Sequence, residues 1–255
     1  MRHLFSSSRK AEQADIGKWL FIYGLCFAIW HIIPVFLGPE IWNKTTLGDL
    51  MDLTAPYVIL SIMCKLYLIL RQQVDKTMMR EKLFFFVHVL LFIGLITAVE
   101  GHGIHLSGNA IYRHLKSFPN TPLSRLTYFF DEIQGHTLWE IGLLLIVSGI
   151  LLLGIHSKID MLKPSSQRWI WVGALLYGFT HFANGVEGQT VVFTFPAAIL
   201  IPGLLIFTFR NNLKQIPRHP IVTFYLVAFL FSDILFAVWG LLNHGFPEFS
   251  DLGWF

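Results

Sequence analysis

The chain has 255 residues, of which 54% are hydrophobic and only 14% are charged, and its mean hydropathy is +0.58. A soluble globular domain carries roughly a quarter charged residues, so the composition excludes that class and predicts an all-α integral membrane protein. The formal net charge of +3 is too small to indicate nucleic-acid binding. The partner that the composition implies is the lipid bilayer, with residues 1–255 forming a single polytopic helical membrane domain.

Seven apolar runs of about 20 residues follow one another along the chain, each long enough to cross about 30 Å of hydrocarbon. They span residues 18–38, 50–70, 83–105, 134–156, 168–187, 190–210 and 221–244. The first run contains Trp30 and His31 and is too long for the apolar core of a signal peptide, so we expect a retained helix. The sequence therefore predicts about seven transmembrane helices in one bundle.

Lysine and arginine are distributed unevenly between the two sides that these helices define. Fourteen precede the first helix or lie in the second, fourth and sixth connections: Arg2, Arg9, Lys10, Lys18, Arg71, Lys76, Arg80, Lys82, Lys158, Lys163, Arg168, Arg210, Lys214 and Arg218. Four lie on the opposite side: Lys44, Arg113, Lys116 and Arg125. Because cytoplasmic loops of membrane proteins are enriched in Lys and Arg, we expect a cytoplasmic N-terminus and a C-terminus outside.

Histidines and carboxylates interrupt three of the apolar runs, and ionisable groups inside a membrane are costly enough to indicate a functional site. The three stretches are 100–105, 131–140 and 181–187. In the predicted topology all three lie in the outer half of the membrane, whereas the inner half is nearly pure Leu, Ile, Phe and Val. We therefore expect one shared cavity that opens to the periplasm, the lumen or the exterior.

The spacing of these polar residues matches the turns of a helix. Glu132, His136 and Glu140 are four residues apart, so they share one helix face. His102 and His105 are three residues apart and also share a face. Each group can therefore direct several polar side chains toward a neighbouring helix.

Imidazole and carboxylate side chains together suit Zn²⁺, Fe²⁺ or Cu²⁺. The candidate metal ligands are His102, His105, His136, His181, Glu100, Asp131 and Glu187, and the candidate catalytic bases are Glu140 and Glu132. His31, His244, Asp49 and Asp52 are further candidates whose membership stays open. The competing interpretations are hydrogen bonding between helices and, for Asp131, a role as the N-cap of the fourth helix. The two cysteines form no paired spacing of the kind that a thiolate zinc site needs.

These features predict a membrane-embedded metal-dependent enzyme, with zinc as the expected cofactor and iron or copper as alternatives. Three histidines would hold Zn²⁺, whose bound water has a pKa of about 7, and a carboxylate would accept the water proton. The expected substrate is a lipid or another amphiphilic or apolar small molecule, which the enzyme would hydrolyse. An iron- or copper-dependent oxidoreductase, including a haem-binding variant, is an alternative. A metal or proton transporter and a non-catalytic subunit of a membrane complex are further alternatives.

Overall fold

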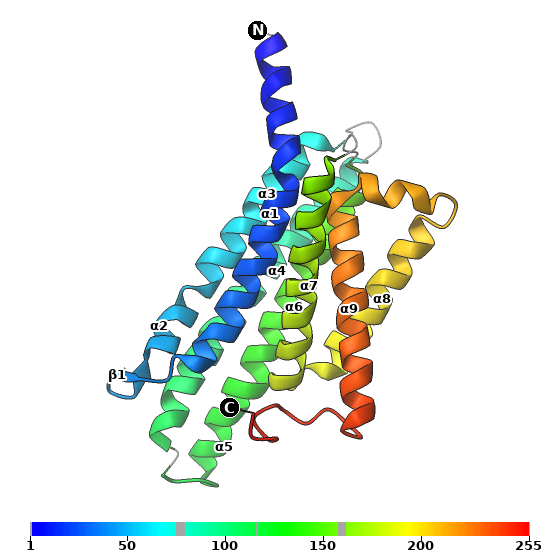
Figure 1. Ribbon diagram of the computed structural model, residues 1–255. Helices are drawn as coiled ribbons and strands as arrows, with labels where there is room; N and C mark the ends of the chain where they lie inside the picture. The colour runs from blue at the N-terminus through cyan, green and yellow to red at the C-terminus, as the bar shows by residue number, and fades with distance from the viewer. Residues whose placement is uncertain (1, 75–79, 116, 158–161, 255) are drawn as a thin grey trace.

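The computed structural model describes residues 2–74, 80–115, 117–157 and 162–254, with side chains from residue 16 onward. The described chain forms a bundle of long helices (Figure 1). The helices are α1 (Arg2–Phe36), α2 (Leu47–Leu53), α3 (Ala55–Gln73), α4 (Glu81–Leu115), α5 (Pro122–Tyr128), the π-helix η1 (Phe129–Gly135), α6 (His136–Ile155), α7 (Pro164–Glu187), α8 (Val191–Thr208), the 3₁₀-helix η2 (Leu213–Arg218) and α9 (Pro220–Leu242). A short antiparallel hairpin, β1 (Glu40–Trp42) and β2 (Thr45–Thr46), connects α1 to α2.

Six helical segments are long and apolar enough to cross a membrane, which supports the prediction of an all-α membrane bundle. They are Ile16–Phe36, Leu47–Gln73, Glu81–Leu115, Pro122–Ile155, Val191–Thr208 and Pro220–Leu242. Among the described helices, α7 corresponds to the remaining predicted span and is not in this set. Small and polar residues interrupt its apolar stretch, although it packs in the bundle against α1 and α9.

The connections between helices lie at two opposite ends of the bundle (Figure 1). The N-terminus lies at the same end as the connections from α3 to α4, from α6 to α7 and from α8 to α9. The β-hairpin, α5 and the C-terminus lie at the other end. This arrangement groups the connections as the charge pattern predicts; Lys76, Lys116 and Lys158, which belong to that pattern, lie outside the described residues.

Three helix boundaries differ from the predicted ones for identifiable reasons. The second predicted helix is divided into α2 and α3, because Pro56 in the first turn of α3 has no N–H to donate to the carbonyl of Asp52, four residues earlier. α4 continues past residue 105 to Leu115, since hydropathy marks only the apolar part of a helix. The fourth helical segment begins at Pro122 rather than 134, because α5 and η1 precede α6 without a break.

Glycines spaced seven residues apart bring α4 into backbone contact with the η1–α6 segment. They are Gly94, Gly101 and Gly108 on α4 and Gly135, Gly142 and Gly149 on the facing segment. Seven residues are about two helical turns, so each set occupies one face. A Cβ atom added at any of the six would lie 2.3–2.9 Å from the neighbouring segment. Small residues of this kind are the usual basis of close helix packing in membranes.

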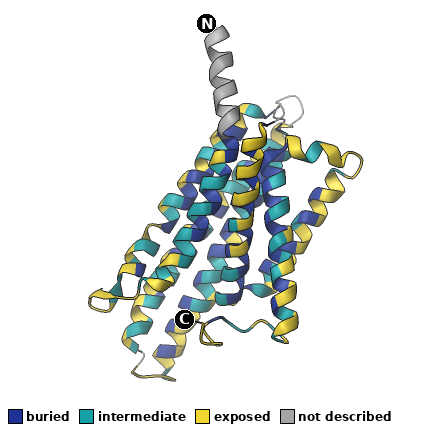
Figure 2. Ribbon diagram, in the orientation of Figure 1, coloured by how far each residue is buried: buried dark blue, intermediate teal, exposed yellow. Residues whose placement is uncertain are grey.

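A second close contact joins α1 and α7, which run side by side in the same direction (Figure 1). A Cβ on Gly24 would lie 2.1 Å from the carbonyl oxygen of Gly173, so the two backbones touch at this level. Next to this contact the interior is filled by aromatic side chains, including the fully buried Tyr23 and Tyr177, whose ring centroids are 5.4 Å apart. Buried residues face the inside of the bundle, and exposed residues cover its outer surface (Figure 2).

Gly101 and Gly103 provide a matched test of the α4–α6 contact. We expect Gly101→Ala to destabilise the protein by about 1–3 kcal/mol, because the new methyl group would lie 2.3 Å from the backbone nitrogen of Trp139. Gly103 has no atom within 4 Å of an added Cβ, so Gly103→Ala should be neutral or stabilising by up to about 1 kcal/mol. Thermal unfolding of both variants in detergent measures the difference. Equal stability of the two variants would contradict the packing described above.

Candidate functional site

One cavity of about 770 Å³ lies at the end of the bundle that holds the hairpin and the C-terminus. Its walls come from α1, α2, α4, η1, α6, α7 and the segment after α9. The polar residues that line it are His31, Thr46, Asp49, Asp52, His102, His105, Asn109, Arg113, Glu132, His136, Glu140, Asn184, Glu187, Glu248 and Ser250. All three polar stretches of the sequence therefore contribute to one cavity, although not every residue in them reaches it.

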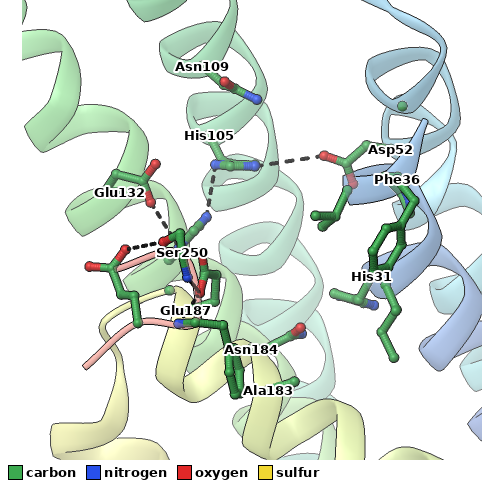
Figure 3. Close-up of a pocket in the computed structure, with 18 of the residues that line it drawn as sticks. His31, Phe36, Asp52, His105, Asn109, Glu132, Ala183, Asn184, Glu187 and Ser250 are labelled. Atoms are coloured by element: carbon green, nitrogen blue, oxygen red, sulfur yellow. Dashed lines mark hydrogen bonds and ion pairs between the residues drawn. The ribbon is translucent and has the colours of Figure 1, made fainter. Parts of the chain in front are cut away.

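His105 is the centre of the polar side chains in this cavity (Figure 3). Its Nδ1 atom lies 2.8 Å from Oδ1 of Asp131 and 3.0 Å from Nε2 of His136. The close helix contact places it there, because a Cβ on Gly135 would lie 2.8 Å from the His105 backbone nitrogen. The glycine interface therefore positions a histidine of α4 directly against the polar residues of η1 and α6.

The contacts around Nδ1 of His105 do not satisfy all of the atoms involved. A neutral imidazole has one N–H, and a carboxylate only accepts hydrogen bonds. Asp131 is only 1% exposed, yet its Oδ1 atom has no hydrogen-bond partner of normal geometry despite its proximity to His105. Nδ1 of His136 is also buried without such a partner. Buried polar atoms without partners are uncommon and require a physical explanation.

Asp52, on α2, faces His105 from the other side of the cavity (Figure 3). Its carboxylate oxygens lie 3.8 Å from Nε2 of His102 and 3.8 Å from Nε2 of His105. Nε2 of His102 also lies 2.9 Å from the Asp52 backbone carbonyl, which can only accept, so this nitrogen is the donor. Its Nε2 lone pair is therefore not available to a metal in this arrangement.

Asp49, by contrast, has a local structural role. It forms a capping box with Thr46 at the start of α2, as expected for an acidic residue in the first turn. Its carboxylate also pairs bidentately with the guanidinium of Arg113. Nothing in the sequence pattern singled out Arg113, because the pair joins residues that are 64 positions apart.

His31 lines the cavity with both ring nitrogens already hydrogen-bonded. Nδ1 lies 2.8 Å from the backbone carbonyl of Phe27, and Nε2 accepts a hydrogen bond from the Trp139 indole at 3.2 Å. The carbonyl fixes the proton on Nδ1, and the indole occupies the lone pair on Nε2. His31 is therefore held as a neutral structural residue beside the cavity.

Glu140 and His181 form a deeper pair. His181 is 2% exposed and does not line the cavity, whereas Glu140 is 3% exposed and does. Oε2 of Glu140 lies 3.9 Å from Nδ1 of His181, and the carboxylate is also hydrogen-bonded to Asn184. Nε2 of His181 faces the carbonyl of Thr194 at 3.4 Å. Glu140 thus separates this histidine from the cluster around His105.

The remaining candidates differ in position. Glu132 lines the cavity, with its Oε2 atom 3.7 Å from Nδ1 of His136, four residues further along the chain. Glu187 also lines the cavity and accepts hydrogen bonds from the segment after α9. Glu100 is exposed on the surface of α4, and His244 is exposed after α9; neither lines the cavity.

Asp131 lies inside the fourth helical segment rather than at its start, so it is not an N-cap. Thr121 caps that segment, with its hydroxyl accepting from the backbone nitrogen of Ser124 at 3.1 Å. Asp131 and Glu132 belong to the π-helix η1, whose wider turn shifts side chains away from their α-helical directions. π-helical turns occur frequently at functional sites, and the sequence contained no signal that identified this one.

The polar side chains do not form a complete metal shell as they stand. In residues 16–254, apart from the segments that the structure leaves undescribed, no three or more His, Cys, Asp or Glu side chains enclose a common point as a bound metal ion requires. Asp131, His105 and His136 instead contact one another in a row centred on His105. Cys26 and Cys64 are both free thiols on different helices, so they add no ligands.

Comparison of the chain with protein-family models, with curated protein sequences and with solved structures gives no match. The candidate site is therefore described entirely by its own geometry: an all-α membrane bundle with a cavity of histidines and carboxylates at one end.

The segment after α9 folds back over the cavity. Phe249 is 7% exposed and packs against Trp239 at a ring-centroid distance of 4.7 Å. Its backbone N–H donates to Glu187 at 2.8 Å, and the Trp239 indole donates to the carbonyl of Pro247 at 3.1 Å. Glu248 lies between these anchors and lines the cavity. Burial, together with the nearby Asp251 and Glu187 carboxylates, raises the pKa of Glu248 above its ordinary value of 4.5.

Docking of residues 245–254 should weaken as pH rises through the raised pKa of Glu248. The protonated carboxyl is favoured in the docked segment, so its contribution is present at low pH and is lost when the proton leaves. The amide hydrogen-exchange protection factors of Phe249 and Ser250, corrected for intrinsic exchange, measure docking. Glu248→Gln should remove this pH dependence, whereas Glu81→Gln at the opposite end of the bundle should keep it. Protection that does not change with pH in the wild type would refute the prediction.

Proposed function

We propose that this protein is a membrane-embedded metal-dependent enzyme whose metal-binding residues are Asp131, His105 and His136. The observation that supports this proposal is the crowding of donor atoms around Nδ1 of His105, at the wall of the cavity. Oδ1 of Asp131 lies 2.8 Å from a histidine nitrogen without a normal hydrogen bond, and two imidazole nitrogens face each other at 3.0 Å. A cation shared by these donors would satisfy all of them together, which a single proton does not.

The donor set fits zinc. Two imidazoles and one carboxylate are an established set of three protein ligands for catalytic zinc, and they leave a position for water or substrate. Bound Zn²⁺ supplies an activated water with a pKa of about 7. Glu132, which faces His136 within the cavity, would accept the proton of that water. Glu140, deeper in the same wall, would donate its own carboxyl proton to the leaving group, and transfer of the proton held by Glu132 would restore both residues.

The proposed reaction is hydrolysis of a lipid or another amphiphilic substrate. The cavity combines polar groups with the apolar side chains of Phe179, Phe249 and Trp254, so it offers surfaces for both parts of an amphiphile. Redox chemistry at iron is a second candidate, favoured by one specific feature: two histidines and one carboxylate are also the ligands of non-haem Fe²⁺ oxygenases.

We also infer the topology of the bundle. Seven membrane-spanning helices, counting α7, with a cytoplasmic N-terminus and an external C-terminus would place the cavity in the outer half of the bilayer. The grouping of the connections at two ends supports this inference, as does the excess of Lys and Arg at the N-terminal end. The cavity would then face the periplasm, the lumen or the exterior.

Metal content tests the proposed centre. Protein purified in detergent without chelators should contain about one equivalent of zinc per chain by elemental mass spectrometry, since one set of three donors serves one ion. His105→Ala, His136→Ala and Asp131→Asn should each lose most of it. Glu132→Gln should keep the metal, because its carboxylate acts on the bound water and not as a ligand.

His88→Ala is the matched control for His105→Ala. His88 lies on the same helix, about 25 Å from His105 along the helix axis, and is hydrogen-bonded to the Tyr67 hydroxyl at 2.6 Å. This variant should keep the full metal content. Iron in place of zinc would favour the oxidoreductase, and wild-type protein that binds neither metal after reconstitution would rule out both candidates.

A further inference from the structure

The lining of the cavity contains two chemically different groups of residues. One is the cluster around His105, and the other is a set of apolar residues near the C-terminal ends of α1 and α7. These two helices touch at Gly24 and Gly173, and both line the cavity about 10 Å further along, from His31 on α1 and Phe179 on α7. The space between them therefore opens below their backbone contact.

Several of the apolar lining residues also reach the outer surface of the bundle. Val35 is 48% exposed, Phe36 is 63% exposed and Phe179 is 44% exposed, yet all three line the cavity. The cavity is therefore partly open at these side chains rather than enclosed. Val35 and Phe36 are the last residues of a segment that is apolar enough to cross a membrane, so in the topology inferred above this opening would face lipid near the outer boundary of the membrane. Ala183, a small residue on α7, also lines the cavity.

The charges in the cavity restrict the polar group that can enter. Six carboxylates line it: Asp49, Asp52, Glu132, Glu140, Glu187 and Glu248. Among the described lining residues Arg113 is the single Lys or Arg, and its guanidinium is already paired with Asp49. Burial raises the pKa of Glu248 and favours its protonated form, so the carboxylates that remain without a Lys or Arg partner include Asp52, Glu132 and Glu187. An anionic head group would approach these like charges, which repel it in a poorly hydrated cavity.

We propose that the cavity binds a membrane amphiphile with an uncharged or cationic head group, whose acyl chain enters laterally between α1 and α7. The head group lies against the cluster around His105, and the chain leaves past Phe179, Ala183 and Phe36. This amphiphile is the substrate class of the enzyme proposed above. Its hydrolysis rests on that proposed function, whereas its binding in the cavity does not. Anionic amphiphiles of the same membrane would bind more weakly, because their head groups approach the carboxylates of the cavity.

Photoaffinity labelling tests the proposed lateral opening between α1 and α7, which is called the portal below. The wild-type protein is reconstituted in phosphatidylcholine vesicles and exposed to a monoalkylglycerol that carries a diazirine in its alkyl chain and has an ether bond in place of the ester, so that it is not hydrolysed. After irradiation, labelled peptides are identified by mass spectrometry. Peptides containing Val35–Phe36 and Phe179–Ala183 should be enriched in label over the lipid-facing surface of α8 at Leu204, which is 64% exposed. The free fatty acid with the same diazirine, which is anionic, should give less enrichment.

Ala183→Trp fills the portal and should lower labelling of the α1 and α7 peptides to the level of the Leu204 reference. If tryptophan at this position prevents folding, the milder variant Ala183→Leu takes its place and should lower the labelling of these peptides partly. Ala237→Trp is the matched control, since Ala237 is exposed on α9 and does not line the cavity, and its labelling should equal that of the wild type.

Three results would overturn the proposal: no enrichment in the wild type, enrichment that persists in both Ala183 variants, or equal enrichment with the anionic fatty acid. The outcome is separate from that of the metal measurement. Labelling of the portal in a protein that binds no metal would support the amphiphile site and reject the metal centre. Bound metal without labelling of the portal would support the metal centre and reject the amphiphile site.

Discussion

The backbone contact between α4 and the η1–α6 segment is the constraint on which the candidate site depends. Inside a bilayer, helices gain little from hydrophobic burial against one another, so close van der Waals packing has to hold them together. The seven-residue glycine spacing provides that packing over the full length of the interface. The same spacing brings the His105 backbone to Gly135, and with it the imidazole to Asp131 and His136. Stability and site geometry thus come from one interface.

The sequence predicted the location of the site better than its internal organisation. Hydropathy and charge placed three polar stretches at one end of the bundle, and all three contribute to one cavity. Helical spacing, however, identifies a face of a helix and not the neighbour that the face meets. His181 was grouped with the other histidines because of its predicted depth in the membrane, but His181 does not line the cavity and Glu140, 3.9 Å from it, does. Arg113 and Asp52 reach the cavity through contacts over 50 or more residues, which no local pattern encodes.

The histidines of the cavity are distinguished by the partners of their ring nitrogens. His31 has both nitrogens occupied, by a carbonyl and by an indole, and is thereby removed from any chemistry that needs a lone pair. His102 has its Nε2 hydrogen committed to a backbone carbonyl. His105 and His136 face each other and a buried carboxylate, so their state depends on what shares the space between them. The histidines thus differ in whether a ring nitrogen is left for a ligand, and this depends on hydrogen-bond partners that the sequence does not reveal.

The π-helix η1 makes the site sensitive to the number of residues in the chain as well as to their identity. A π-helical turn contains about one residue more than an α-helical turn, and one residue corresponds to about 100° of rotation. Loss of a single residue from Phe129–Gly135 would let the segment relax into a regular α-helix. Asp131 would then turn away from His105, while α6 and its glycine contacts with α4 stayed in place. A one-residue deletion could therefore abolish the site in a bundle that remains folded.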